Sequence, residues 1–169
     1  MAAWKDLERT TAEISGGIRL CRGANFSKSS PEVDHPIFIF ECKYRNIVEK
    51  RYSRIFDFIR FKEKVLIIYH RDRVILKRKD WIKECKEGNN IYENFEIPTT
   101  KKYSTFLERT ITQAIGYSSE KIPIVVYKSR GMWDAFVYLK REDWDRICCK
   151  SFKEYYNKTM ENWKNDNTR

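Results

Sequence analysis

Two charged side chains close an apolar segment of the chain and are the first candidates for chemistry. Residues 37–40 (Ile-Phe-Ile-Phe) are followed directly by Glu41, Cys42 and Lys43. Alternate residues of an extended strand point to the same face, so Glu41 and Lys43 share a face and Cys42 points away. The uninterrupted apolar run predicts a strand that is buried on both faces. Because buried charges are unfavourable unless they are paired or hold a metal ion, this strand end points to a site.

Other carboxylates precede the strand. Glu32 and Asp34 lie just before it, and Glu8 lies in a segment with helical spacing. Converging carboxylates bind Mg²⁺ or Mn²⁺, and the cation removes a repulsion of about 4 kcal/mol between two carboxylates that lie close together. Such an ion polarises a phosphodiester and lowers the pKa of a bound water molecule. The Lys43 ammonium could orient that water or neutralise charge in the transition state.

The upstream ligand remains open between two acids. A hairpin that turns at His35-Pro36 would bring Glu32 or Asp34 beside Glu41. The two acids are two residues apart in a strand, so a shift of register by two keeps the same face. The residues alone leave both Glu32 and Asp34 open.

The positive charge of the chain is concentrated after this strand. The net charge is +10, and residues 43–86 hold fifteen basic and six acidic side chains with interleaved aromatic residues. This pattern indicates a polyanionic partner, and nucleic acid is favoured over an anionic membrane. In the polar loop after residue 18, Arg19, Arg22 and Lys28 are candidate phosphate contacts, and Arg45 follows the strand.

The periodicity of apolar residues predicts one α/β domain over residues 1–169. We expect helices at 3–15, 45–61, 79–86, 102–115 and 142–163, strands at 37–43, 65–70, 73–77, 122–128 and 134–140, and a loop at 87–100. Gly16-Gly17 should end the first helix.

Two segments of the chain are similar to each other. Residues 63–85 and 120–148 each contain a strand, a turn, a strand and a Lys-Arg-x-Asp-Trp step that leads into a helix. Asp80 and Asp143 stand where these helices should begin, as capping or dipole-stabilising residues do. Two explanations fit the similarity: a duplication of one segment, or convergent punctuation, by which we mean independent use of the same turn and helix-start residues in two αβ segments.

Several classes of protein are disfavoured. The five cysteines show neither disulfide-framework nor zinc-site spacing. The chain has no apolar run of membrane-spanning length and no apolar core of a signal peptide near its start. We therefore expect a cytoplasmic protein with no membrane partner.

The order of these features resembles the PD-(D/E)xK nuclease superfamily. The features are a leading helix with Glu8, Gly16-Gly17-x-Arg19, a Ser-containing loop, residues 31–36 and Glu41-Cys42-Lys43. Within the superfamily, the chain is most similar to the Holliday junction resolvase-like proteins of archaea, phages and archaeal viruses. The match covers residues 5–45 well and 100–145 fairly, whereas residues 46–99 look like an insertion or a partial duplicate.

The resemblance implies a restriction-endonuclease-like mixed β-sheet flanked by helices. It also implies Mg²⁺- or Mn²⁺-dependent hydrolysis of DNA at branched four-way junctions by a homodimer. Such a protein is intracellular, and viruses and phages are among the sources that the resemblance includes. Glu41 and Lys43 match the (D/E)xK motif and Glu8 matches the helix carboxylate. Glu32 takes the upstream position, where the family usually has Asp. Glu8, Glu32 and Glu41, with Asp34 as the alternative, would bind the metal.

Three functional hypotheses follow from the sequence. The first is a metal-dependent endonuclease that resolves four-way junctions. The second is a nuclease of the same superfamily with a repair or restriction-like specificity. The third is a basic nucleic-acid-binding protein without catalytic activity.

Overall fold

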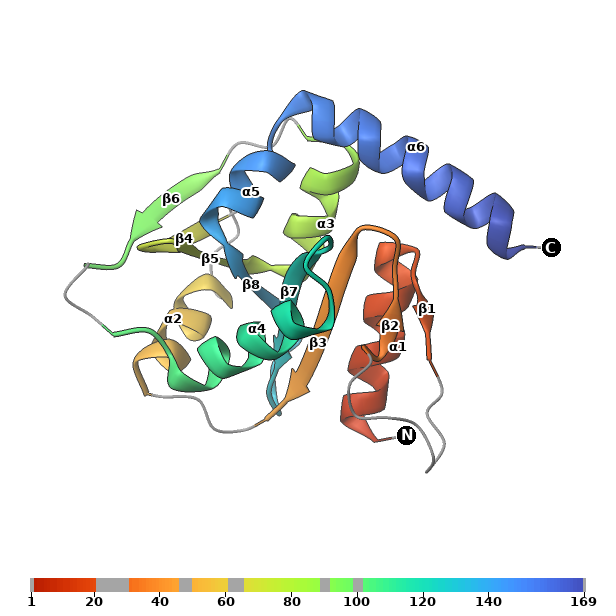
Figure 1. Ribbon diagram of the computed structural model, residues 1–169. Coiled ribbons are helices and arrows are strands. Elements are labelled where there is room, and N and C mark those ends of the chain that lie inside the picture. The colour runs from red at the N-terminus through yellow and green to blue at the C-terminus, as the bar shows by residue number, and fades with distance from the viewer. Residues whose placement is uncertain are drawn as a thin grey trace.

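The computed structural model describes residues 2–20, 31–45, 50–60, 66–88, 92–98 and 102–168 (Figure 1). In chain order the elements are α1 (Ala3–Ser15), β1 (Ile18–Arg19), β2 (Val33–Asp34), β3 (Phe38–Tyr44), α2 (Lys50–Arg60), β4 (Leu66–His70), β5 (Arg73–Lys77), α3 (Arg78–Lys86), β6 (Glu93–Glu96), α4 (Thr105–Tyr117), β7 (Ile122–Lys128), β8 (Phe136–Lys140), α5 (Arg141–Ile147) and α6 (Lys150–Asn167). The described part of the chain contains no helix with the length and apolar character required to cross a membrane.

A mixed six-stranded sheet forms the centre of the molecule, as the α/β prediction requires. Its strand order is β3-β7-β8-β5-β4-β6, and β1 and β2 form a separate two-stranded sheet. The two outer pairs, β3 with β7 and β4 with β6, are parallel, and the three inner pairings are antiparallel. The basic segment after β3 therefore contributes strands to the same sheet.

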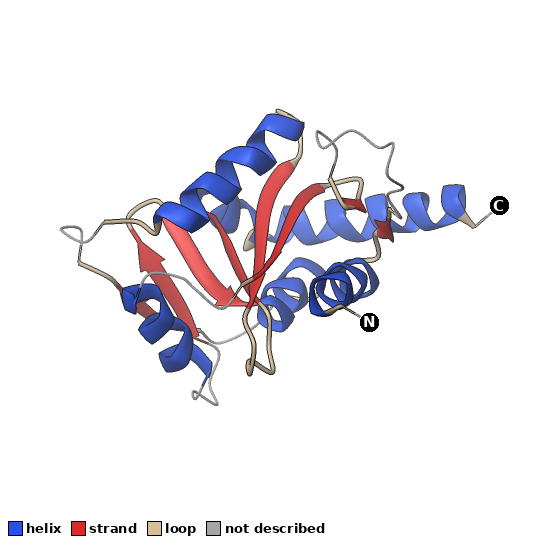
Figure 2. Cartoon of the chain, turned by 90° about the horizontal axis from the view of Figure 1, so that it is seen from below, coloured by secondary structure: helices blue, strands red, loops and turns tan. Residues whose placement is uncertain are grey.

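Helices cover both faces of this sheet (Figures 1 and 2). Helices α1, α3, α5 and α6 pack on one face, where their buried residues include Leu7, Trp81, Trp144 and Phe152. Helices α2 and α4 pack on the other face around a second core. We refer to these as the α1 face and the α4 face. Side chains alternate between the two faces along each strand, which explains why the central strands are apolar without interruption.

The two halves of the sheet are related by a pseudo-two-fold axis. The antiparallel β5–β8 register is centred on the pair of Ile75 with Tyr138. The flanking pairs are equivalent on the two sides of this centre: Arg73 lies opposite Lys140 on one side, and Lys77 lies opposite Phe136 on the other. Arg78 N–H donates to Ala135 O, and Arg141 N–H donates to Asp72 O, both at 2.8 Å. The units α2-β4-β5-α3 and α4-β7-β8-α5 therefore have the same order and equivalent hydrogen bonds.

Two element predictions were wrong. The expected loop at 87–100 contains β6, which the pattern missed because all four of its residues are exposed and it lacks an apolar alternation. The expected helix at 142–163 is two helices, because Cys149 adopts an extended backbone (φ −73°, ψ 142°) before α6 begins. This break lets Phe152 and Tyr156 pack into the core of the α1 face.

The repeated Lys-Arg-x-Asp-Trp step does begin a helix in each copy. Lys77 and Lys140 are the N-caps of α3 and α5, without a capping hydrogen bond from either side chain. Asp80 and Asp143 instead lie in the first helical turn, so the dipole explanation fits and the capping explanation is wrong. Burial raises the pKa of both carboxyls.

Candidate functional site

Strand β3 holds the Glu41–Lys43 pair at one edge of the sheet. Glu41 is 2% exposed, and its Oε1 forms an ion pair with Lys43 Nζ at 2.8 Å. The two residues lie opposite Val125 and Tyr127 of β7, which belong to the core of the α4 face. Cys42 belongs to the core of the α1 face. The shared face of Glu41 and Lys43 and the burial of the strand are confirmed.

Helix α1 supplies a second buried carboxylate. Glu8 is 3% exposed, and its Oε2 accepts from Arg19 Nε at 3.1 Å. The helix ends at Gly16, whose positive φ of 80° turns the chain back so that Arg19 in β1 can reach Glu8. Arg19 is therefore engaged with an acid of the candidate site, which reduces its availability for a phosphate.

The predicted hairpin between the upstream acids and β3 is wrong. Strand β2 pairs antiparallel with β1, with Ile18 opposite Asp34 and Arg19 opposite Val33. Local alternation could not reveal this partner, because β1 lies on the far side of residues 21–30. Gly17 permits the close approach, since a Cβ there would lie 2.8 Å from the backbone oxygen of Asp34.

His35 fixes the connection from β2 to β3. Its Nδ1 accepts hydrogen bonds from the N–H groups of Ile37 (3.1 Å) and Phe38 (3.2 Å). Its Nε2 therefore carries the proton and donates to Ser15 O, 3.0 Å away. Burial lowers the pKa of His35 to about 4. The neutral imidazole thus joins the end of α1 to the start of β3, in the structural role that a histidine in a turn suggests.

Three carboxylates act on one thiol between α1 and β3. Burial raises the pKa of Cys42, and the negative charges of Glu32, Glu8 and Glu41 raise it further, against a hydrogen bond with Thr11. Oε2 of Glu32 is buried. The charges of Glu8, Glu32 and Glu41 therefore all reach Cys42, although Glu41 and its partner Lys43 lie on the opposite face of β3 from the Cys42 side chain.

These acids do not form a ready metal site in the described residues. Within those ranges, no group of three or more His, Cys, Asp or Glu side chains is arranged to hold a metal ion. Glu8 comes from the α1 face and Glu41 from the α4 face, and each is ion-paired with a cation, Arg19 or Lys43. Carboxylate oxygens suit Mg²⁺ or Mn²⁺ by chemistry, but this arrangement neutralises two of them with side chains.

The remaining predicted DNA contacts have different placements. Arg45 is exposed at the end of β3, and its guanidinium lies 5.0 Å from the centre of the Phe106 ring. Arg22 and Lys28 lie outside the described residues. Arg45 is therefore the described candidate that keeps an exposed position close to Glu41 and Lys43 in the chain.

Sequence reasoning missed a basic residue that reaches this region from α3. The Arg78 guanidinium donates to Thr11 Oγ1 (2.9 Å) and Thr10 Oγ1 (3.0 Å) of α1. Its charge also interacts with Cys42. The repeated Lys-Arg-x-Asp-Trp step was the available signal, although it had suggested only a helix start.

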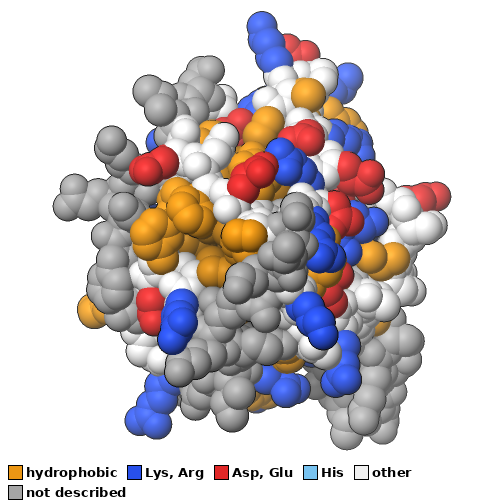
Figure 3. Space-filling view, turned by 90° about the vertical axis from the view of Figure 1, so that its left-hand side faces the viewer, with side chains coloured by type: hydrophobic (Ala, Val, Ile, Leu, Met, Phe, Trp, Pro, Cys, Tyr) orange, Lys and Arg blue, Asp and Glu red, His pale blue; other side chains and the backbone are white. Residues whose placement is uncertain are grey.

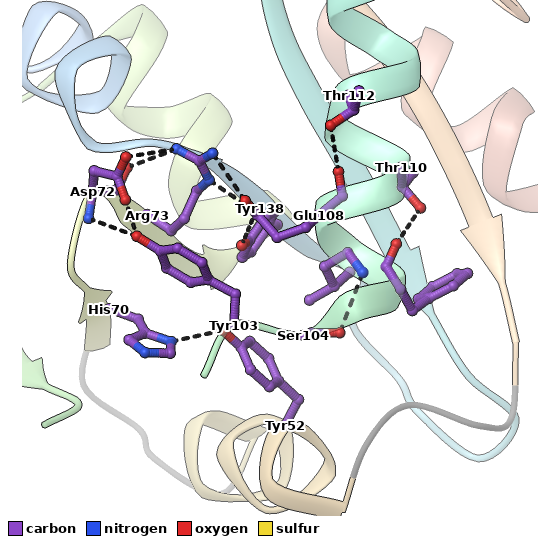
Figure 4. Close-up of polar contacts among 12 residues, drawn as sticks. Tyr52, His70, Asp72, Arg73, Tyr103, Ser104, Glu108, Thr110, Thr112 and Tyr138 are labelled. Carbon is purple, nitrogen blue, oxygen red and sulfur yellow. Dashed lines mark hydrogen bonds and ion pairs between the residues drawn. The ribbon is translucent and has the colours of Figure 1, made fainter. Parts of the chain in front are cut away.

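A second polar cluster joins α4 to the β4–β5 hairpin (Figure 4). Arg73 donates to Glu108 through Nε (2.9 Å) and Nη2 (3.0 Å), and Tyr138 also donates to Glu108. Tyr103 donates to Asp72 in the hairpin turn. No local spacing signals this cluster, because its members come from three distant segments. It fixes α4, the helix that covers Glu41 and Lys43.

Comparison with known proteins returned no match: no family model, curated protein or solved structure is similar to this chain at a significant level. The function must therefore be inferred from the residues and geometry described above.

Proposed function

We propose that the chain is a metal-dependent endonuclease that hydrolyses DNA phosphodiester bonds, with four-way junctions as its substrate. The observation that carries this proposal is the Glu41–Lys43 pair on edge strand β3, in which a 3% exposed carboxylate contacts a 25% exposed lysine at 2.8 Å. A carboxylate and an amine are costly to bury, and a pair of apolar residues would serve a structural strand end equally well. A catalytic role would explain why charged residues occupy this strand end.

The surrounding residues support the same chemistry. Glu8 and Glu32 bring two more carboxylates toward Cys42, the residue of β3 between Glu41 and Lys43 whose side chain lies on the other face of the strand. A bound Mg²⁺ would polarise the phosphodiester and generate the attacking hydroxide. Binding it would require Arg19 and Lys43 to release their carboxylates. Arg19 and Lys43 would then be available to the phosphate and to the attacking water.

The test compares variants that keep side-chain shape. Glu41→Gln should reduce Mg²⁺-dependent cleavage of a synthetic four-way junction by on the order of a hundredfold or more, and Lys43→Met should do the same. Glu13→Gln is the matched control, because Glu13 is an exposed acid of α1 whose ion pair with Arg9 lies at the surface. Circular dichroism establishes that each variant is folded. Cleavage at the wild-type rate by folded Glu41→Gln would refute the proposal.

The choice of DNA substrate separates two nuclease specificities. Paired symmetric nicks at the crossover of the junction would support resolution. Preferred cleavage of a flap or a linear duplex would instead support a repair or restriction-like enzyme.

A second candidate is a nucleic-acid-binding protein without catalysis. It is favoured by the two ion pairs, since Arg19 and Lys43 already neutralise Glu8 and Glu41. It predicts full binding with no cleavage in Mg²⁺ or Mn²⁺ at any pH. Under both candidates, affinity should fall steeply with salt concentration.

A further inference from the structure

An apolar patch lies at the edge of the sheet opposite the Glu41–Lys43 pair. It surrounds β6 and α2, and Figure 3 shows hydrophobic side chains gathered on this face of the molecule. Phe95 is 52% exposed and Phe58 is 42% exposed, with ring centres 5.7 Å apart. A cavity of about 190 Å³ lies beside them, and its lining is Arg54, Ile55, Phe58, Ile68, Phe95 and Ile97. We call this set the β6 patch.

The backbone of β6 is also available for pairing. Within the described ranges, β6 pairs with β4 on one side and with no strand on the other. Ile97 N–H donates to Tyr69 O at 2.7 Å, so the peptide groups of Phe95 face β4 in the same way. Because the direction alternates along a strand, the peptide groups of Asn94 and Glu96 point outward. An edge with exposed aromatic residues is a template for an added strand.

We propose that a second copy of the chain adds to this edge, with the two β6 strands antiparallel around a two-fold axis at Phe95. In this register Asn94 of each copy exchanges backbone hydrogen bonds with Glu96 of the other. The two Phe95 residues then form the closer, non-hydrogen-bonded pair. The result joins two six-stranded sheets into one.

Charge and shape select this register over its neighbours. Centring the axis on Glu96 would place two glutamates opposite each other, and centring it on Asn94 would place Phe95 of each copy opposite Glu93 of the other. The register centred on Phe95 avoids both. It also places Glu93 of one copy opposite Ile97 of the other, on the α4 face, where Arg54 is the basic residue of the patch. A two-fold interface must complement itself in this way.

The first experiment measures mass against concentration. Analytical ultracentrifugation of the full chain should show a reversible monomer–dimer equilibrium. Phe95→Lys should weaken the dimer by about tenfold or more, because it removes the central aromatic pair and opposes two charges. Trp133→Lys is the control, since Trp133 is 91% exposed and lies outside the patch; it should leave the dimer unchanged.

Two further variants test the strand pairing itself. Asn94→Pro removes only an outward N–H, so the fold should persist while the dimer weakens. Phe95→Cys should form a disulfide-linked dimer on oxidation, beyond the background from the exposed Cys148 and Cys149 that the wild type and Trp133→Cys reveal. A chain that stays monomeric at every concentration would overturn the proposal. A dimer that resists both Phe95→Lys and Asn94→Pro would place the interface elsewhere and overturn it equally. None of these measurements depends on nuclease activity.

Discussion

Single buried residues hold the candidate site in place through fixed protonation states. His35 is 1% exposed and neutral, because two backbone N–H groups donate to Nδ1 and leave no room for a second proton. A positive charge on this ring would be buried without a counter-charge, which is why its pKa falls to about 4. The connection between α1, β2 and β3 therefore depends on pH.

We expect the stability of the protein to fall as the pH drops below about 6.5, the pKa of histidine in the unfolded chain. Between this value and the folded pKa of about 4, the unfolded state binds more protons than the folded state. The full loss, reached below the folded pKa, is about 3 kcal/mol. Urea unfolding at neutral pH and at pH values down to the folded pKa measures it.

The variant His35→Asn isolates this effect from other acids. Its amide oxygen can still accept from the backbone of Ile37, so the variant should fold with lower stability at neutral pH. It should lose the part of the pH dependence that His35 supplies. An identical pH dependence in wild type and variant would rule out the histidine as its source.

At the scale of elements, α4 is clamped to the sheet by a carboxylate with several donors. Glu108 accepts two hydrogen bonds from Arg73 and one from Tyr138. The Arg73 side chain is 14% exposed, so removing Glu108 would leave Nε and Nη2 largely buried without their acceptor, with Asp72, 3.3 Å away, as the remaining ion-pair partner of the guanidinium. Helix α4 covers Glu41 and Lys43, so the clamp also supports the candidate site.

Glu108→Ala should lower the free energy of unfolding by about 2 kcal/mol, which is less than the loss of a fully buried pair because Glu108 is partly exposed. Tyr138→Phe should cost about 1 kcal/mol, the value of one hydrogen bond. Glu13→Ala, at an exposed ion pair, should change stability little. Chemical denaturation measures all three. Equal effects of Glu108→Ala and Glu13→Ala would contradict the clamp.

Features that depend on residues close together in the chain could be predicted from the sequence. The shared face of Glu41 and Lys43 follows from strand alternation, and the end of α1 follows from Gly16. The pairing of β2 with β1 could not be predicted, because it depends on a partner across the intervening loop. The same holds for the contact of Arg78 with Thr11, which lie 67 residues apart. The helix break at Cys149 results from packing of α6 on the core.

At the scale of the whole molecule, the symmetric hydrogen bonds favour duplication over convergent punctuation. Trp81 and Trp144 follow the two Lys-Arg-x-Asp steps and are 0% and 1% exposed, in one shared core. Strands β4, β5 and β6, the described strands of segment 46–99, are therefore the partner half of the sheet rather than an added lobe. Each unit completes the core of the other through β5 and β8.

Because the two units share one sheet and both contribute to the core on each of its faces, we expect a single cooperative unfolding transition. Far-UV circular dichroism and tryptophan fluorescence should report the same midpoint in urea. Separate midpoints for the two signals, or a populated intermediate, would show that the units unfold independently.

The pseudo-two-fold axis gives the sheet two unlike ends. A row of paired residues crosses it from Glu41 through Val125, Tyr138, Ile75 and Ile68 to Phe95, so the charged edge and the aromatic edge occupy equivalent positions. Five inter-strand steps put these edges roughly 24 Å apart. In a dimer joined at β6, the two Glu41–Lys43 pairs would be separated by at most about 53 Å along the joined sheet. The width of each folded sheet would then set the distance between the two candidate sites, and hence the distance between two DNA positions that the dimer could contact at once.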